Sequence, residues 1–161
     1  MTFNPFRKTV LRSVLLLLLV LGGCAGQEIR QPKESVKTDP ELAAKFEKEG
    51  RTAFEEGRKG TAVKAWKKAV ELDPTHAVTV NNLALVLKDQ HRFAEAAKLL
   101  EAGLVHSPDV AELHFNLAVI AELYLLDLET ALVHYNRYRE LTEEDDQQVA
   151  GWIADLERRL E

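Results

Sequence analysis

Residues 73–108 read DPTHAVTVNNLALVLKDQHRFAEAAKLLEAGLVHSP, and this stretch holds one full period of an internal repeat. Its two prolines, Pro74 and Pro108, are 34 residues apart, and Pro40 lies 34 residues before the first. A fixed interval of about 20–50 residues is typical of stacked supersecondary units, and one of 34 residues fits a helix–turn–helix hairpin. The sequence therefore predicts three successive helical hairpins.

The residues before the prolines predict where each hairpin begins. Asp39, Asp73 and Ser107 precede the three prolines, and such side chains accept hydrogen bonds from the free amides of a first helical turn. Proline suits that turn because its missing N–H has no partner there. We therefore expect each proline to open a helix.

Aligned on the prolines, the units cover residues 43–76, 77–110 and 111–142 and share a pattern of large and small residues. The first unit places signature residues at its fourth, eighth, fifteenth, twentieth, twenty-fourth, twenty-seventh and thirty-second positions: Phe46, Gly50, Gly57, Ala62, Trp66, Ala69 and Pro74. This pattern resembles the tetratricopeptide repeat (TPR). The third unit fits only with one residue inserted around residues 124–127. The resemblance implies an all-α right-handed superhelix of three hairpins over residues 39–142.

The small and bulky positions of this pattern have packing reasons. Small residues at the eighth and twentieth positions let the two helices of a hairpin cross closely. These pairs are Gly50 with Ala62, Ala84 with Ala96, and Ala118 with Ala131. On the second helices, bulky residues are expected to fill the space between hairpins: Trp66, Leu100 and Tyr135.

Residues 143–161 predict a helix that caps the array. A stripe of apolar side chains runs along it, and charged residues occupy the rest: Val149, Trp152, Ile153, Leu156 and Leu160 form the stripe. Repeat arrays need such a terminal element with one polar face. The acidic residues 143–146 are expected at its start, where negative charge complements the helix dipole.

Residues 1–23 have the pattern of a secretory signal peptide. Arg7, Lys8 and Arg12 make the start positive, and an apolar run follows at residues 14–21. That run is too short to span a bilayer comfortably.

Leu21-Gly22-Gly23-Cys24 then resembles the lipobox of bacterial lipoproteins. The resemblance implies acylation of the Cys24 thiol, cleavage before it and usually acylation of the new amino group. Several acyl chains, each gaining roughly 0.8 kcal/mol per buried CH₂, would hold a domain firmly on a membrane. An uncleaved signal anchor, or a chance cysteine beside an apolar run, is the alternative.

Residues 24–38 are expected to be the lipidated cysteine and a polar, flexible linker. Cys24 is the only cysteine of the chain, so no intrachain disulfide is possible. An aspartate after the cysteine resembles an inner-membrane retention signal in Gram-negative lipoproteins. Because Ala25 stands there, the outer membrane, facing the periplasm, is favoured for a Gram-negative source.

The charge of the chain argues against nucleic-acid binding. The net charge is −5, and the signal segment contributes +3, so the remainder has 18 basic against 26 acidic residues. A general nucleic-acid binder needs a basic face, which this acidic remainder does not offer.

The TPR resemblance also implies a concave groove lined by the first helix of each hairpin. Carried over by position, the candidate partner-binding residues are Lys48, Arg51, Asn81, Asn82, Lys88, Phe115, Asn116 and Val119. Asn82 and Asn116 share the sixth position of adjacent units, so we expect their amides side by side. An amide offers a donor and an acceptor, which suits clamping of an extended peptide backbone. The alternative is that asparagine is merely tolerated on a solvated face.

A carboxylate clamp, as in some TPR domains, is excluded. Glu47 and Glu112 stand at the positions where that clamp needs cations.

Catalysis and metal binding find no support in the sequence. It contains no recognisable nucleophile–base arrangement and no glycine-rich phosphate loop. His76 and His106 are expected at hairpin ends and His91 in a turn, too far apart to share an ion. We therefore expect no enzyme, no metal and no cofactor apart from the acyl lipid on Cys24.

These features predict a lipid-anchored, non-enzymatic TPR adaptor or scaffold in a bacterial cell envelope. It would bind a partner protein or peptide in its groove and assist the assembly or regulation of an envelope complex, in the manner of a pilotin or an adaptor for an envelope enzyme. No nucleic acid or small-molecule substrate is expected. The alternative is a self-associating structural lipoprotein that stacks through its capping helix and has no peptide ligand.

Overall fold

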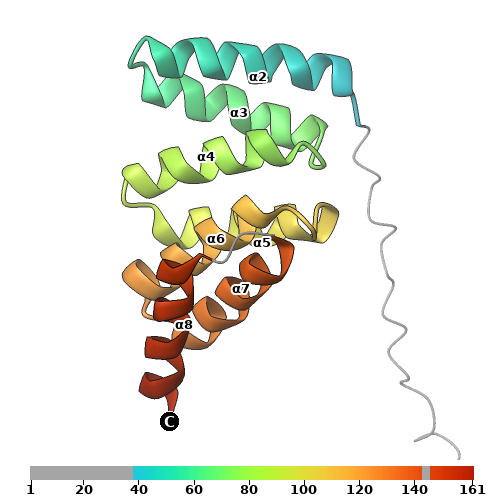
Figure 1. Ribbon diagram of the computed structural model, residues 1–161. Helices are drawn as coiled ribbons and strands as arrows, with labels where there is room; N and C mark the ends of the chain where they lie inside the picture. Colours follow the sequence, from blue (N-terminus) through green and yellow to red (C-terminus); the bar gives the residue numbers. More distant parts are fainter. Residues whose placement is uncertain (1–37, 143–145) are drawn as a thin grey trace, which may run out of the picture. The chain divides into compact units, whose positions relative to one another are not determined.

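The computed structural model describes residues 38–142 and 146–161, and these residues form helices and short turns without any strand (Figure 1). Their elements are α2 (Pro40–Glu55), α3 (Lys59–Leu72), α4 (Ala77–Asp89), α5 (Phe93–His106), α6 (Ala111–Ile120), the π-helical turn η1 (Ala121–Leu125), α7 (Leu128–Leu141) and α8 (Gln147–Leu160). No helix in this described part has the length and apolar character needed to cross a membrane. The signal segment, Cys24 and the linker up to residue 37 lie outside it.

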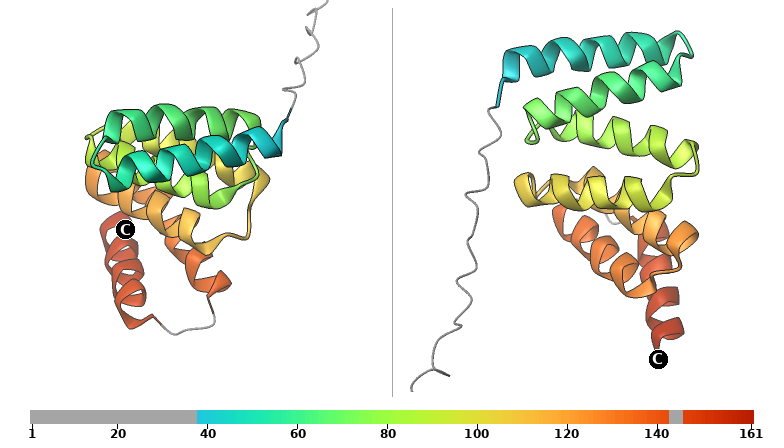
Figure 2. Two further views of the ribbon diagram at one scale, coloured as in Figure 1. Left: turned by 90° about the horizontal axis from the view of Figure 1, so that it is seen from above. Right: turned by 180° about the vertical axis from the view of Figure 1, so that it is seen from behind.

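Consecutive helices pair into the three predicted hairpins. α2 packs against α3, α4 against α5 and α6 against α7, and the hairpins follow one another in chain order (Figure 1). α8 packs against α7 after the last hairpin. Seen from above, α2 lies on the side from which Figure 1 is viewed and α3 lies behind it (Figure 2). The expected architecture of three hairpins and a C-terminal helix is therefore confirmed.

Pro40 occupies the predicted place at the first residue of its helix. The Asp39 carboxylate accepts a hydrogen bond from the Leu42 amide at 3.0 Å, so the predicted cap is present. The Asp39 amide also donates to the carbonyl oxygen of Leu72 at 3.1 Å. This second bond ties the start of α2 to the end of α3.

The same prediction is wrong for Pro74 and Pro108. Both lie in the turns between hairpins, and the following helices begin three residues later, at Ala77 and Ala111. The residue before each proline instead caps the end of the preceding helix. A residue that cannot donate an amide hydrogen bond also fits a turn that stops a helix, and here that role prevails.

Side chains in these turns bond to the turns themselves. The Asp73 carboxylate accepts hydrogen bonds from the amide (3.0 Å) and the hydroxyl (2.6 Å) of Thr75. The Ser107 hydroxyl donates to the carbonyl oxygen of Thr75 at 3.2 Å. Two successive inter-hairpin turns are therefore linked.

The extra residue of the third unit is accommodated by the π-helical turn η1. One left-handed residue marks the turn inside each hairpin: Gly57, His91 and Leu126. The interval between them is 34 residues and then 35. A π-turn closes its hydrogen bond one residue later than an α-turn, so it takes up one inserted residue without breaking the helix. The predicted insertion thus lies within and just after residues 121–125.

The small positions allow the close helix contacts that were predicted. The five alanines at these positions are fully buried. Gly50 is needed because a Cβ on it would lie 2.4 Å from Cδ1 of Trp66, and the Trp66 indole donates to the carbonyl oxygen of Glu47 at 3.2 Å. The buried Trp66 therefore lies directly on the backbone of α2.

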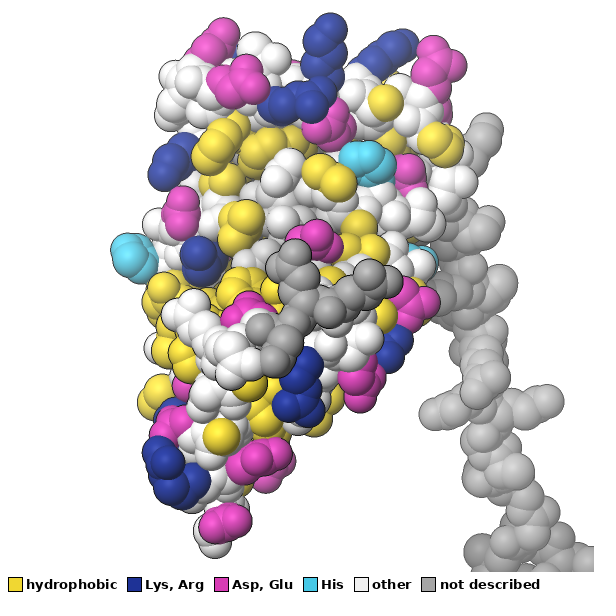
Figure 3. Space-filling model, viewed as in Figure 1, with side chains coloured by type: hydrophobic (Ala, Val, Ile, Leu, Met, Phe, Trp, Pro, Cys, Tyr) yellow, Lys and Arg dark blue, Asp and Glu magenta, His cyan; other side chains and the backbone are white. Residues whose placement is uncertain are grey.

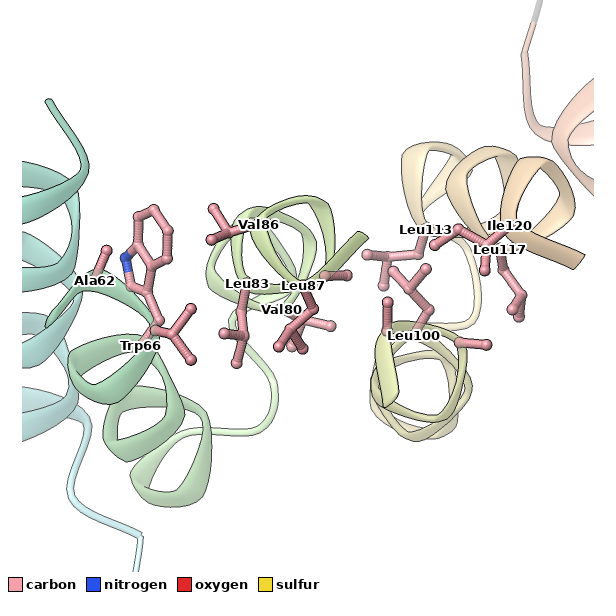
Figure 4. Packing of buried hydrophobic residues seen from close by; sticks show 14 of the residues in the cluster. Ala62, Trp66, Val80, Leu83, Val86, Leu87, Leu100, Leu113, Leu117 and Ile120 are labelled. Atoms are coloured by element: carbon pink, nitrogen blue, oxygen red, sulfur yellow. The ribbon is translucent and has the colours of Figure 1, made fainter. Parts of the chain in front are cut away.

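The core consists of two apolar clusters that meet at α6. The first extends from Ala53 and Trp66 to α6 and includes Leu83 and Leu100 (Figure 4). The second joins α6, η1, α7 and α8 around Tyr135. α6 contributes Leu113, Leu117 and Ile120 to the first cluster and Ala118 to the second. An apolar surface on both sides is expected of a helix buried between two layers.

α8 has the predicted start and most of the predicted stripe. The Asp146 carboxylate accepts hydrogen bonds from the amides of Gln148 (3.0 Å) and Val149 (3.1 Å), while residues 143–145 lie outside the described part. Val149, Ile153 and Leu156 are buried. Leu160 was expected on the buried stripe but is exposed, because it is the last helical residue.

Gly50→Ala should destabilise the protein. The new methyl group would clash with the buried indole, and overpacking of this kind costs about 1–3 kcal/mol. Urea unfolding followed by circular dichroism would measure the change. Gly151→Ala is the control, because a Cβ there meets nothing within 4 Å and alanine in a helix is favoured by up to about 1 kcal/mol. A Gly50→Ala protein as stable as wild type would contradict the close contact.

Candidate functional site

The predicted partner-binding residues lie on the first helices of the three hairpins. Lys48 and Arg51 are exposed on α2, and the other six candidates are half-buried on α4 and α6: Asn81, Asn82, Lys88, Phe115, Asn116 and Val119. Figure 3 shows the side of the molecule on which α2 lies, with hydrophobic side chains over its middle and charged ones among and around them. We call the surface formed by α2, α4 and α6 the first-helix face.

A hydrogen bond between two asparagines joins adjacent hairpins on this face. The Asn116 amide nitrogen donates to the amide oxygen of Asn81 at 2.7 Å, which links α6 to α4. Asn116 was expected beside Asn82, the residue at the same repeat position, but its bonding partner is the preceding residue. The bond uses one donor and one acceptor, so the Asn81 amino group and the Asn116 oxygen remain for a ligand.

α8 covers part of the face in the third unit. The Phe115 ring lies between helices, with its centroid 5.1 Å from that of Tyr138 and 6.2 Å from that of Trp152. Val119 packs on the second cluster. Both candidates therefore contact the capping region as well as the face.

Polar contacts also fix α8 to this unit. The Arg159 guanidinium lies 3.2 Å from the Glu122 carboxylate, and Glu122 also interacts with the Tyr135 side chain. Burial, with Glu122 beside it, raises the pKa of Tyr135.

Sequence reasoning treated α8 only as an end cap. The sequence did contain a sign that α8 continues the repeat. With the inserted residue counted, a fourth unit would begin at residue 146, and its fourth and eleventh positions are the apolar Val149 and Leu156, as the same positions are apolar in the first unit (Phe46 and Ala53).

The charges on the face are only partly neutralised. Arg51 pairs with Glu47 one turn away at 3.3 Å, and Asp89 lies 3.8 Å from Lys59. Within residues 38–142 and 146–161, Lys48 and Lys88 form no ion pair, so their charges are available to a ligand.

Two hollows lie near these helices. The first, of about 80 Å³, lies between the starts of α2 and α4 and is lined in part by Ala44 and Glu47 of the face. The second, of about 330 Å³, lies between α3 and α5, over Leu83 and Leu87 of α4. At the rim of this hollow, Nζ of Lys67 lies 2.6 Å from Oε1 of Glu95, and this hydrogen bond lowers the pKa of Glu95.

The structure brings together two histidines that sequence reasoning did not pair. Nδ1 of His114 lies 2.8 Å from Nδ1 of His134, and Nε2 of His114 lies 3.0 Å from the carbonyl oxygen of Pro108. His114 is buried, and burial, followed by the effect of His114, lowers the pKa of His134. The two residues lie 20 positions apart on different helices, so no local spacing marks them.

The other three histidines lie where they were predicted. His76 precedes α4, His106 ends α5 and His91 is in the turn inside the second hairpin. The described residues contain no group of three or more histidine, cysteine or acidic side chains that could hold a metal ion.

Comparisons with known proteins identify the fold. No profile of a protein family matches the sequence, and no curated protein matches it. The solved structure of the first TPR of Spaghetti (RPAP3) bound to the HSP90 peptide SRMEEVD is 20% identical, with a TM-score of 0.66, and the match covers 77% of this chain and 97% of that one. The TPR2B domain of yeast Sti1 in its pHsp70 complex is 18% identical, with a TM-score of 0.62, covering 73% and 98%.

A bacterial structure is similar as well. The Yersinia enterocolitica type III secretion chaperone SycD, in complex with a peptide of the translocator YopD, is 14% identical, with a TM-score of 0.63, covering 73% of this chain and 94% of that one. Together with the three hairpins, these similarities show that the chain has the TPR fold.

The depressed pKa of His134 predicts that acid destabilises the fold. The unfolded chain, with an ordinary histidine pKa of 6.5, binds the proton more readily than the folded one, so stability is lost as pH falls from this value toward the lower folded pKa. Urea unfolding between about pH 7.5 and about pH 5.5 should show this loss in wild type and a smaller loss in His134→Gln. His106→Gln, at an exposed helix end, is the control. An equal loss in all three proteins would assign the effect to other groups.

Proposed function

We propose that this protein is a lipid-anchored, non-enzymatic TPR adaptor that binds an extended segment of a partner protein on its first-helix face. The partner would belong to a complex that is assembled or regulated in a bacterial cell envelope. The similar RPAP3, Sti1 and SycD structures were solved as complexes, two of them with peptides, which supports a peptide-binding role for this fold.

The proposed binding site rests on the hydrogen-bonded pair of Asn81 and Asn116. An extended backbone presents N–H and C=O groups in alternation, and the pair offers the Asn81 amino group and the Asn116 oxygen to them. Because the two amides already bond to each other, their orientation is fixed before a ligand arrives. A ligand then loses less side-chain entropy on binding, which favours affinity.

Lys48 and Lys88 add charge to the site. Neither is neutralised by an ion pair in the described part of the chain, and they lie on the first helices of adjacent hairpins. A partner segment with an acidic residue near its clamped backbone fits this arrangement. The carboxylate clamp excluded above is not restored by these two lysines, because Glu47 and Glu112 keep the clamp positions acidic.

The anchor in this proposal is Cys24. Acyl chains on its thiol and amino group would attach the protein to a membrane, which in a Gram-negative source would be the outer membrane, on its periplasmic side. The polar residues 25–37 would then give the array roughly 20 Å of reach from the membrane. The lipid would be the only group added to the chain.

The double substitution Asn81→Ala with Asn116→Ala should abolish partner capture. Envelope proteins recovered by crosslinking and pull-down with wild type should be missing with this variant, because neither amide remains to hold the backbone. Asn136→Ala is the matched control, since Asn136 lies on the second helix α7 and bonds the Leu132 carbonyl oxygen of its own helix. Circular dichroism would verify folding of both variants. Recovery of the same partners by the double variant would refute the site.

Cys24→Ser should release the protein from the membrane. The hydroxyl group cannot form the thioether to diacylglycerol, so the protein should move from the membrane fraction to the supernatant after cell fractionation. Mass spectrometry of wild type should find the acyl groups on Cys24. Retention of the variant in the membrane fraction would refute anchoring by this residue.

A further inference from the structure

Four consecutive apolar residues are exposed at the turn between α6 and α7. The exposed fractions are 60% for Leu123, 44% for Tyr124, 39% for Leu125 and 74% for Leu126. The Tyr124 ring stacks on that of Phe93, with centroids 4.2 Å apart and planes 14° from parallel. We call Phe93 and residues 123–126 the apolar turn. A contiguous exposed apolar surface of this kind marks an interaction site more often than a scattered leucine does.

The TPR fold itself does not require this surface. Aligned on the left-handed residue, the corresponding turns of the other two hairpins are mostly polar: residues 54–57 read Phe-Glu-Glu-Gly, and residues 88–91 read Lys-Asp-Gln-His. All three turns connect the first helix of a hairpin to its second helix and pass through one left-handed residue. A run of four exposed apolar residues is therefore specific to the third hairpin.

The backbone holds the apolar turn in a defined shape. Leu126 has φ of 57°, a left-handed conformation that costs a non-glycine residue about 1 kcal/mol or more. The Asp127 amide donates to the carbonyl oxygen of Ala121 at 2.9 Å, and the Asp127 carboxylate accepts from the Thr130 amide at 3.1 Å. The π-turn and this cap together direct consecutive apolar side chains to the solvent.

The shape and chemistry of the apolar turn favour a lipid surface over a peptide. Its four consecutive apolar side chains are all exposed at one short turn, so they can enter a bilayer surface together. Its leucines suit the acyl region of a bilayer, and a tyrosine at their edge suits the interface. Asp127 and Glu129 are exposed beside it, so attraction to anionic headgroups does not contribute.

We propose that the apolar turn inserts into the surface of a bilayer of neutral lipids and orients the array on the membrane. This inference rests on the membrane anchoring in the proposed function, because a weak insertion needs a tether. The 14 Cα–Cα steps from Cys24 to Thr38 span at most about 50 Å at full extension, and α2 is about 24 Å long. The tether is therefore long enough for the turn edge of the array to meet the same membrane.

Hydrogen exchange of the full chain tests the inference. The chain is bound to phosphatidylcholine vesicles, and exchange of the amides of residues 121–127 is compared with that of the Cys24→Ser chain in solution without vesicles. We expect several-fold slower exchange on vesicles in this segment, and no change in residues 55–58 and 89–92, which are internal controls. Added phosphatidylglycerol should not increase the protection.

Two variants separate insertion from anchoring. Leu123→Gln with Leu126→Asn should still float with the vesicles but lose the protection; asparagine tolerates the left-handed conformation at residue 126. Val105→Gln removes another apolar side chain, 79% exposed on α5, and should keep the protection.

Three outcomes would overturn the inference. If wild type floats with the vesicles but its residues 121–127 exchange as fast as those of the Cys24→Ser chain in solution, insertion is refuted and the anchor is not. If wild type does not float with the vesicles, anchoring through Cys24 is refuted, and the inference fails with it. Protection of residues 121–127 without vesicles, rising with protein concentration, would assign the apolar turn to a second copy of the chain.

Discussion

The close crossing of two helices at small residues is the constraint on which each hairpin depends. In the first hairpin the indole of Trp66 lies on the bare backbone at Gly50 and donates to the carbonyl oxygen of Glu47. In the other two hairpins, fully buried alanines serve the same purpose. Because the crossing point fixes the rotation of both helices, it also decides which side chains of the first helix remain on the outer face. The candidate site therefore follows from the packing.

The repeat pattern predicts the fold well because packing at each signature position of the repeat requires one type of residue. Proline spacing and the small residues at Gly50 and Ala84 were sufficient for three hairpins and for the place of the insertion. The positions of Pro74 and Pro108 were not predictable from cap preference, because aspartate and serine stabilise a turn that ends a helix as readily as one that begins it. The preferences of single residues leave open whether these prolines begin a helix or follow the end of one, and the packing of the turn between hairpins determines the outcome.

The details of the site depended on helix rotation and on contacts between distant residues. Register placed Asn82 and Asn116 at equivalent positions, but the pitch between hairpins brings Asn81 to Asn116. The amphipathic pattern of α8 predicted a cap without showing that its aromatic side chain reaches Phe115. The His114–His134 contact likewise joins helices whose sequences give no local sign of it. Such contacts arise only when all elements are in place.

The bond from the Asp39 amide to the Leu72 carbonyl oxygen has a mechanical consequence. Tension along the chain from residue 38 acts at the open end of the first hairpin, where α2 begins and α3 ends. This hydrogen bond and the capped first turn of α2 bear the load before the helix can be peeled from its partner. The force is then shared by both helices of the hairpin, and Trp66, which lies against Gly50 farther along α2, resists their separation. A domain held by one end under strain would thus yield as a hairpin and not residue by residue.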